Sequence, residues 1–374
     1  MNIIFTSTSL IVIPFVLGLT TAFFLIKQVK SMKLGIDSSI GVQKTHHLPT
    51  SRLGGVAVVV ATISGVLTLY SIDSKLTSLF SNLVFCASPV FFAGLLEDVT
   101  HKVSPSWRLI CAVFSAVLVI YSCGAKVLRT DFFLVDLLLR WESIVIIVSI
   151  IVIAGFTNAI NMIDGFHGLA LTQVMLIQFF IGLMSWDAKQ FDIYYASLII
   201  YVSSLSLLVL NWPRGRIFLG DGGAYFLGFV TVSLGLIFLY RIPSVSPLCL
   251  IVLGSYPLID ATFSIYRRLI IRHQSASSPD HLHMHSLIFR RFIKQNWRSF
   301  PKSYVIIFGQ SNNANYQNAA VGLFLFVFIF SVDCLAWYFK SNAVVLGLIL
   351  VTLLTAYLYI FKLFCQFKIK KIFK

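Results

Sequence analysis

Residues 143–169 read SIVIIVSIIVIAGFTNAINMIDGFHGL. Residues 143–157 of this stretch carry no charged side chain. A run of this kind suits a helix within a bilayer, because a helix satisfies its own backbone polar groups where no water is present. Residues 158–169 then change abruptly to amides, a carboxylate and glycines. The stretch predicts a helix that crosses a membrane and ends in a polar cluster at its surface.

The apolar pattern recurs along the whole chain. A bilayer core requires about 20 apolar residues per helix, and eleven stretches without Lys or Arg approach this length: 3–26, 53–70, 79–96, 109–123, 143–157, 166–186, 194–212, 224–240, 247–265, 319–339 and 343–361. The chain is 58% apolar and 11% charged, whereas soluble domains carry roughly 25% charged residues. These values exclude a water-soluble globule, a disordered chain and a protein with a single anchor.

We therefore predict an all-α, polytopic integral membrane protein of about eleven transmembrane helices. Residues 1–374 are expected to form one membrane domain, with a catalytic core at 40–292 and a C-terminal helix pair at 319–361 that is followed by a basic tail. The six cysteines show no disulfide or metal-binding spacing. The first span lacks a basic n-region and a clear cleavage site, so we expect it to be retained.

The distribution of cations predicts the orientation. Of 29 Lys and Arg, 22 fall in the loops from odd to even spans and in the C-terminal tail. Cytoplasmic loops collect such residues, which places the N-terminus outside and the C-terminus in the cytoplasm. The net charge of +15 is then a property of a membrane protein, and no nucleic-acid partner is expected.

The predicted cytoplasmic loops contain six carboxylates: Asp37, Glu97, Asp98, Asp164, Asp221 and Asp280. Most of them lie within a few residues of a span end, in short segments that contain glycine. Acidic residues gathered among many cations at one membrane surface favour a bound metal ion and an anionic substrate. The alternative is that they only balance the charge of the loops.

Asn158, Asn161 and Asp164 are spaced three residues apart, which places them on one stripe of a helix. Two amides and a carboxylate at a membrane surface suit a sugar nucleotide and a hard cation, which prefers oxygen ligands. A packing role for all three residues is disfavoured, since unpaired amides at that depth are costly.

Glycines flank Asp221 in the segment GRIFLGDGGAYFLG, residues 215–228. Glycines allow the backbone to approach a phosphate, and the start of the next helix directs N–H groups toward it. Asp221 is then expected to hold Mg²⁺ against a diphosphate. From the residues alone, Phe218 either stacks on a base or packs in lipid, and packing is favoured. The Gly54-Gly55 pair is expected to serve close helix packing.

Basic and acidic side chains precede these segments. Lys44, His46 and Arg52 can hold a lipid phosphate at the headgroup level, or they can serve only as a positive-inside anchor. Glu97 and Asp98 are adjacent at a helix end. One can act as a base and the other as a metal ligand, or both can belong to a solvated helix end.

Histidines alternate in SPDHLHMHSLIFRR, residues 278–291. The spacing of His281, His283 and His285 resembles a zinc site on a strand, but no cysteine or fourth ligand is nearby. Contact with a phosphate or a sugar is the better interpretation. In the preceding span, Asp260 is an acid within the membrane. It is either functional or hydrogen-bonded within the helix bundle.

In their order, these segments resemble the polyprenyl-phosphate N-acetylhexosamine-1-phosphate transferases (glycosyltransferase family 4). Five motifs carry the resemblance. They are the basic segment 44–55, the pair Glu97-Asp98 in place of a paired aspartate, 158–169 as Asn-x-x-Asn-x-x-Asp-Gly-x-x-Gly-Leu, 218–222 as Phe-x-Gly-Asp, and 279–288 as the histidine motif of the bacterial GlcNAc-1-phosphate branch.

The resemblance implies transfer of a HexNAc-1-phosphate from a UDP-N-acetylhexosamine to undecaprenyl phosphate, which releases UMP. This would be the first membrane step of O-antigen or other surface polysaccharide synthesis, in the bacterial inner membrane. The cofactor would be Mg²⁺, with Mn²⁺ as a substitute, and a homodimer stays open. The implied catalytic residues are Asp98, Glu97 and Asp164, and the implied metal ligands are Asp221 and Asn161. The implied substrate-binding residues are Lys44, His46, Arg52, Asn158, Phe218, His283 and His285, with Phe218 stacked on the uracil ring.

The chain departs from the family pattern at four positions. Glu97 replaces an aspartate, His101 stands where many relatives have a third acid, His281 stands where arginine is frequent, and Ser286 stands where another histidine is frequent. Two alternatives follow. A phospho-MurNAc-pentapeptide transferase would show a longer histidine-rich signature, and a transporter would show broken helices with polar residues near the middle of the bilayer.

Overall fold

The computed structural model describes residues 3–32, 35–37, 50–273, 275, 282–293 and 314–372. Helices dominate this part of the chain, which confirms the predicted fold class. The helices are α1 (Ile3–Met32), α2 (Gly54–Ile72), α3 (Ser74–Cys86), α4 (Ser88–Thr100), α5 (Pro105–Cys123), α6 (Phe133–Leu138), α7 (Glu142–Ile163), α8 (Leu169–Asp187), α9 (Phe191–Asn211), α10 (Gly220–Arg241), α11 (Pro247–Leu253), α12 (Ser255–Tyr266), η1 (Arg267–Ile271), α13 (Met284–Ile288), η2 (Phe289–Ile293), α16 (Ala314–Tyr338) and α17 (Ala343–Ile372).

The strands of the described residues are very short. β1 (Ile36–Asp37) pairs antiparallel with β2 (Thr50–Ser51), and Ser51 forms a further isolated bridge to Ile217. This small pairing lies just before α2. It fixes the backbone around Arg52 next to the segment that leads into α10.

Nine described helices are long and apolar enough to cross a membrane, and two bent helix pairs raise the number of spans to eleven. The two short predicted spans, 109–123 and 143–157, are extended to Pro105–Cys123 and Glu142–Ile163. The Ser104 side chain accepts the backbone N–H of Trp107 and starts α5 earlier than hydropathy alone indicates.

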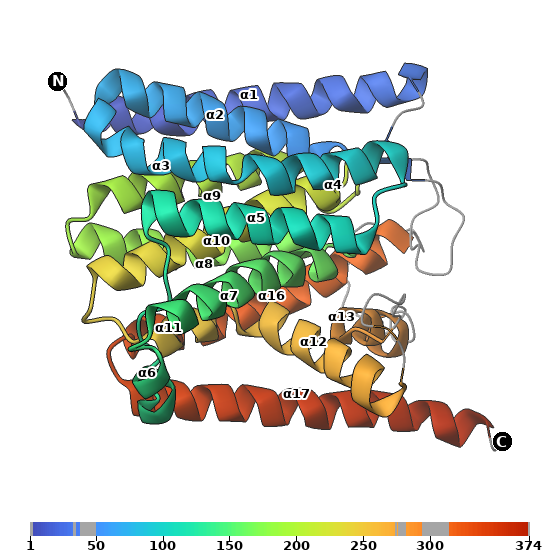
Figure 1. Cartoon of the computed structure of the whole chain (residues 1–374). Coiled ribbons are helices and arrows are strands. Elements are labelled where there is room, and N and C mark those ends of the chain that lie inside the picture. The colour runs from blue at the N-terminus through green and yellow to red at the C-terminus, as the bar shows by residue number, and fades with distance from the viewer. Residues whose placement is uncertain are drawn as a thin grey trace.

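The third and ninth predicted spans are bent, which hydropathy could not show. α3 and α4 meet at 44° near Ala87, and α11 meets the helix that starts at Ser255 at 77° near Gly254. α12 therefore diverges from the bundle toward α13 and α17 (Figure 1). This divergence places Asp260 of α12 beside His283 and Met284.

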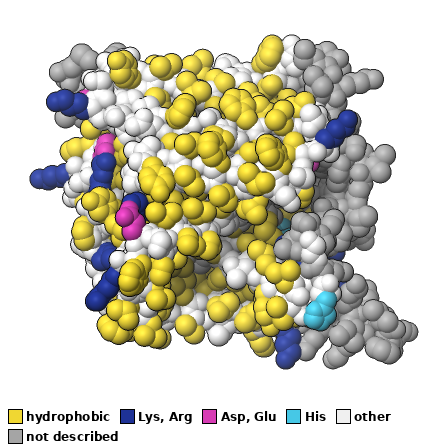
Figure 2. All heavy atoms as spheres, in the orientation of Figure 1, with side chains coloured by type: hydrophobic (Ala, Val, Ile, Leu, Met, Phe, Trp, Pro, Cys, Tyr) yellow, Lys and Arg dark blue, Asp and Glu magenta, His cyan; other side chains and the backbone are white. Residues whose placement is uncertain are grey.

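α10 is the central helix of the bundle, and 89% of its apolar window is buried. α1 and α17 lie on opposite outer sides, and the two termini lie at opposite ends (Figure 1), as an odd number of spans requires. Figure 2 shows a broad band of apolar side chains with the coloured charged groups near its two ends. This distribution is that of a surface facing lipid.

Glycines bring α2 and α4 into backbone contact with the first turn of α10. A Cβ at Gly55 would lie 2.3 Å from the backbone nitrogen of Gly223, and a Cβ at Gly94 would lie 2.6 Å from the Cα of Gly222. The predicted packing role of Gly55 is confirmed. The contact sets the ends of α2, α4 and α10 side by side, where the polar cluster forms.

Candidate active site

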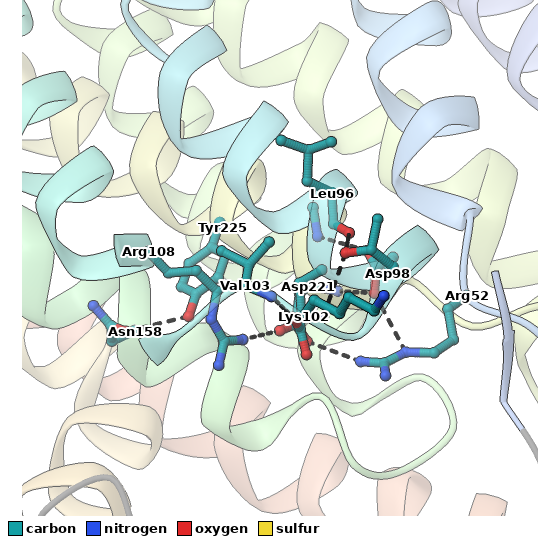
Figure 3. A network of polar contacts seen from close by, with 12 residues as sticks. Arg52, Leu96, Asp98, Lys102, Val103, Arg108, Asn158, Asp221 and Tyr225 are labelled. Atoms are coloured by element: carbon teal, nitrogen blue, oxygen red, sulfur yellow. Dashed lines mark hydrogen bonds and ion pairs between the residues drawn. The ribbon is translucent and has the colours of Figure 1, made fainter. Parts of the chain in front are cut away.

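Asp221 lies in the first turn of α10, between two arginines from other parts of the chain (Figure 3). The Arg52 Nη2 is 3.0 Å from its Oδ1, and the Arg108 Nη1 pairs with its Oδ2. Arg52 precedes α2, and Arg108 lies in the first turn of α5. Each carboxylate oxygen thus faces one guanidinium group, and the three side chains form a charged unit at one end of the bundle.

Asp98 of α4 lies beneath this unit and is 1% exposed. Its Oδ1 accepts the backbone N–H of Asp221 and its Oδ2 that of Gly222, both at 2.9 Å. The Arg52 Nε is 3.3 Å from Oδ1. Asp98 therefore acts as a tertiary cap on α10, where a carboxylate also interacts favourably with the positive end of the helix dipole.

Asp164 approaches the same helix end from α7, which ends at Ile163. The backbone N–H of Gly220 is hydrogen-bonded to its carboxylate. Burial raises the pKa of Asp164 well above its usual range, and the negative charge of Asp221 raises it further. Asn158 and Asn161 lie within α7, as the predicted helical stripe requires. Because α7 ends at Ile163, Asp164 is its C-cap residue and lies just beyond the stripe.

The amides of α7 meet a tyrosine that the sequence analysis did not single out. The Tyr225 Oη donates to Asn158 Oδ1 at 3.4 Å, and the Asn161 side chain is hydrogen-bonded to the same hydroxyl. Arg108 lies over the Tyr225 ring, with its Cζ 5.9 Å from the centroid. Tyr225 follows Asp221 by one helical turn, so it joins the amide stripe to the carboxylate and arginine unit.

Arg108 and Tyr225 are the site residues that sequence reasoning missed. A cation at the start of an apolar helix has the same pattern as a positive-inside anchor, and a tyrosine in an apolar helix has the same pattern as a packing residue. Their one available signal was position: both lie within a few residues of a span end on the side that holds the acidic motifs.

Glu97 serves a different part of the site from its neighbour Asp98. Its Oε2 accepts the backbone N–H of Val103 at 2.8 Å, which fixes the connection between α4 and α5. Adjacent helix residues point in different directions, so the pair does not share one partner. In the described structure Glu97 orients the connection that leads to Arg108.

The expected phosphate cradle at the start of α10 differs from the structure. The backbone N–H groups of Gly220, Asp221 and Gly222 are taken by Asp164 and Asp98. The glycines after Asp221 instead permit the close approach of α2 and α4. Carboxylates paired with Arg52 and Arg108 occupy the place where backbone N–H groups were expected to face a phosphate.

Phe218 lies next to β2, where its backbone N–H donates to Ser51 O at 2.8 Å. Its half-buried ring contacts His167, with 5.7 Å between centroids and 32° between planes. The backbone N–H of His167 donates to Asn318 Oδ1 at 2.7 Å. A residue at the start of α16 therefore supports this aromatic pair.

His283 and His285 form two parallel imidazoles, 5.3 Å apart between centroids and 2° between planes. His283 precedes the short helix α13 and His285 lies in it, so these two histidines do not lie on a strand. Burial lowers the pKa of His285 to about 4. A Cβ at Gly165 would be 3.9 Å from the Nε2 of His285, which places this imidazole beside the end of α7.

Asp260 resolves one alternative that the sequence left open. Its carboxylate is fully buried and hydrogen-bonded to His283, to the backbone of Met284 and to Tyr357. It is thus a hydrogen-bonded acid of the bundle that contacts the histidine segment. The predicted residues Lys44, His46 and His281 lie outside the described residues.

A divalent cation fits the chemistry of this cluster. Among the described residues no three His, Cys, Asp or Glu side chains form a protein-only metal site. Mg²⁺ does not require one, because it commonly binds one or two carboxylates together with substrate phosphates and water. Asp221 and Asp164 supply hard oxygen donors. Burial and then the charge of Asp221 raise the pKa of Asp164, and a bound cation would favour the charged form of both carboxylates.

An apolar groove of about 620 Å³ runs along the lipid-facing side of the bundle between α7, α10 and the bent ninth span. Gly155 and Ala159 of α7 line it, as do Leu236 of α10 and Ile265 of α12. Ala159 is adjacent to Asn158, so the groove reaches the level of the amide stripe. At the other end it reaches residues 126–130.

Part of the chain is similar to a known protein family. Residues 80–239, which contain Asp98, Arg108, Asn158, Asp164 and Asp221, match glycosyl transferase family 4. Three similar proteins illustrate the relationship.

The first is named "probable undecaprenyl-phosphate N-acetylglucosaminyl 1-phosphate transferase" of Bacillus subtilis (strain 168). It is 28% identical over 94% of this chain and 90% of its own length. The undecaprenyl-phosphate alpha-N-acetylglucosaminyl 1-phosphate transferase of Escherichia coli (strain K12) is 26% identical over 78% of both chains. That of Salmonella typhi is 24% identical over 72% of this chain and 74% of its own.

Proposed function

We propose that this chain belongs to glycosyl transferase family 4 and transfers a HexNAc-1-phosphate from a UDP-N-acetylhexosamine to undecaprenyl phosphate. The observation that carries the proposal is the convergence of Asp221, Asp164, Arg52 and Arg108 at one end of a membrane bundle, beside an apolar groove along its side. A charged cluster for phosphates and a groove for a lipid chain are the two parts that this reaction requires. The names of the relatives support the same reaction.

The reaction exchanges one phosphoanhydride for another. An oxygen of the acceptor phosphate bonds to the sugar-bearing phosphorus, and the bond from that phosphorus to the bridging oxygen of UMP breaks. Catalysis then consists of positioning and charge neutralisation. Arg52 and Arg108 are close enough to the cluster to bind phosphate oxygens, and both present planar guanidinium groups suited to that task.

A bound Mg²⁺ would offset the negative charge of the diphosphate. Asp221 and Asn161 are the ligands we propose, with Asp164 beside them, and Mn²⁺ is the expected substitute. Phe218 would stack on the uracil ring from its position beside His167. Asn158, His283 and His285 would contact the donor.

The acceptor does not require a strong base. A phosphate monoester has a second pKa near 6, so it is mostly a dianion at neutral pH. Asp98 has both oxygens engaged by the start of α10, and we propose that it orients Asp221 without removing a proton. Glu97 would act through the connection between α4 and α5. The apolar groove would hold the isoprenoid chain.

We further propose that the site faces the cytoplasm of a bacterium and that the protein lies in its inner membrane. The excess of Lys and Arg falls in the loops on the side of the site, which supports this orientation. The product would enter O-antigen or another surface polysaccharide.

The two alternatives have less support. A transporter would place polar groups near the middle of the bilayer, whereas the acid within the ninth span is engaged by the histidine segment and α17. A phospho-MurNAc-pentapeptide transferase shares the same chemistry, and a panel of donors separates it from the proposed enzyme.

Purified protein in detergent, given undecaprenyl phosphate, Mg²⁺ and a panel of UDP-N-acetylhexosamines, should release UMP. Chelation by EDTA should stop the release, and Mg²⁺ or Mn²⁺ should restore it. Asp221→Asn should lower turnover at least about 100-fold, while the matched variant Asp187→Asn at the far end of α8 should retain it. Release of UMP only from UDP-MurNAc-pentapeptide would favour the alternative, and no release from any donor would exclude both.

A further inference from the structure

Asp260 collects three hydrogen bonds from segments far apart in the chain. Its Oδ2 pairs with the His283 Nδ1 at 2.7 Å. Its Oδ1 accepts the Met284 backbone N–H at 2.9 Å and the Tyr357 Oη at 2.7 Å. The carboxylate is fully buried. The three hydrogen bonds replace those that it would make to water and so offset the cost of burying it.

This arrangement fixes the protonation pattern of His283. Asp260 accepts hydrogen bonds from the Met284 N–H and the Tyr357 hydroxyl, as a carboxylate does, and a carboxylate partner makes the His283 Nδ1 the donor. A ring whose Nδ1–H is held by a carboxylate has a defined orientation and leaves Nε2 for its other partner. The ring lies parallel to that of His285, which is held at its own Nδ1 by the Tyr256 hydroxyl at 3.0 Å.

The C-terminal helix takes part in this arrangement. Tyr357 is 8% exposed, although only 17% of the apolar window of α17 is buried. Nearby, the Arg267 Nη1 donates to the Leu282 carbonyl at 3.0 Å, and its Cζ lies 5.0 Å from the ring centroid of Phe361 in α17. α12 and α17 thus hold the segment before α13 at several points.

We propose that Asp260 and Tyr357 are positioning residues that hold His283 in the orientation and tautomer needed to contact the donor substrate. The inference rests on the proposed function and assigns α17 to the catalytic unit, beyond the core predicted at 40–292. Arg267 and Tyr256 also support the same segment. Tyr357 is 97 residues from Asp260 in the chain, so no sequence motif joins them.

The test compares two tyrosines of one helix. Tyr357→Phe removes only the hydroxyl and keeps the aromatic packing, whereas Tyr359→Phe makes the same change at a side chain that is 64% exposed. We expect Tyr357→Phe to lower kcat/KM for the UDP-sugar roughly tenfold, and Asp260→Asn roughly 10- to 100-fold. The KM for undecaprenyl phosphate should stay unchanged, and Tyr359→Phe should match the wild type.

A double-mutant cycle separates positioning from general stabilisation. If Asp260 acts through His283, Asp260→Asn should cause no further loss in a His283→Ala background. Additive losses would show independent roles and would overturn the inference. Equal activity of Tyr357→Phe and Tyr359→Phe would show that the Tyr357 hydroxyl does not help to position His283.

A second measurement does not depend on turnover. In protein labelled with ¹⁵N-histidine, the imidazole signals that disappear in His283→Ala belong to His283. Those signals should report an Nδ1-protonated ring in the wild type and should change in Tyr357→Phe and Asp260→Asn. Unchanged signals would overturn the inference by themselves, whereas a wild type inactive toward every donor would overturn the proposed function.

Discussion

The backbone N–H of Asp221 donates to Oδ1 of Asp98 at 2.9 Å, across 123 residues of sequence. The next amide, that of Gly222, donates to the other oxygen of the same carboxylate. A residue of the fourth helix therefore fixes the first turn of α10, and with it the carboxylate that we propose as the principal metal ligand. Charge and helix capping act together at this point.

Replacement of Asp98 by Asn should destabilise the protein and misplace Asp221. The amide offers one acceptor where the structure uses two, and it removes the charge that faces Arg52. We expect a loss of about 1–2 kcal/mol in the free energy of unfolding and a fall in kcat of at least about tenfold. Thermal unfolding in detergent and UMP release measure the two effects.

Asp73→Asn is the matched control. Asp73 also caps a helix, since it accepts the Lys75 and Leu76 amides at the start of α3, but it lies at the end of the bundle opposite the site. Its replacement should change stability without changing kcat. If Asp98→Asn lost activity with an unchanged melting temperature, Asp98 would have a direct chemical role.

Gly94→Ala should disrupt the contact between α4 and α10. The new Cβ would lie 2.6 Å from the backbone of Gly222, and neither helix can move without displacing Asp98 or Asp221. We expect a destabilisation of about 1–3 kcal/mol together with loss of activity. Gly347→Ala, where a Cβ meets nothing within 4 Å, should be neutral or slightly stabilising. Similar behaviour of the two variants would contradict the proposed backbone contact.

His285 should make the protein less stable in acid. Burial lowers its pKa from 6.5 to about 4, so between these pH values the unfolded chain binds a proton that the folded chain does not. Stability therefore falls as the pH drops from about 6.5 to about 4, and the linked free energy is about 3 kcal/mol. Melting curves at pH 7 and pH 4.5 measure the difference.

The variant His285→Asn should show a shallower dependence of melting temperature on pH over that interval. His273→Gln removes an exposed histidine and should keep the slope of the wild type. Identical slopes for His285→Asn and the wild type would mean that His285 titrates normally in the folded protein.

Gly155→Phe should fill part of the apolar groove. Gly155 lines the groove from α7, and a Cβ there has no neighbour within 4 Å, so the ring can enter without forcing helices apart. We expect the KM for undecaprenyl phosphate to rise about tenfold, or about 1.4 kcal/mol, with the KM for the UDP-sugar unchanged. Gly347→Phe in α17 is the control, and an equal effect of both would place the lipid chain elsewhere.

Asn158 and Asn161 show which part of the site a local sequence pattern can predict. Asn158 and Asn161 lie on one face of α7 because their spacing and the apolar run before them both favour a helix. The pattern could not show that Tyr225 from α10 would join them. The role of Arg108 could not be predicted for the same reason, because its partner Asp221 is 113 residues away in the chain.

Asp260 is a residue that the sequence marked as unusual but whose role it left open. Its type and depth marked it as unusual for a membrane span, but two interpretations stayed open until its partners were known. They are His283 just before α13, Met284 at its start and Tyr357 of α17, and the 77° bend after α11 brings Asp260 to them. The glycine-rich segment at 220–223 was also ambiguous, because glycine permits both phosphate approach and close helix packing.

The sequence by itself determined that the chain is an all-α membrane protein of about eleven spans and that its chemistry-bearing motifs gather at one end of them. Those features follow from hydropathy and charge, which act locally along the chain. The tertiary structure alone decided which side chains face one another: Asp98 under α10, Arg52 and Arg108 on Asp221, and Tyr357 on Asp260. Those pairings depend on how bent helices pack, and no short-range pattern encodes that geometry.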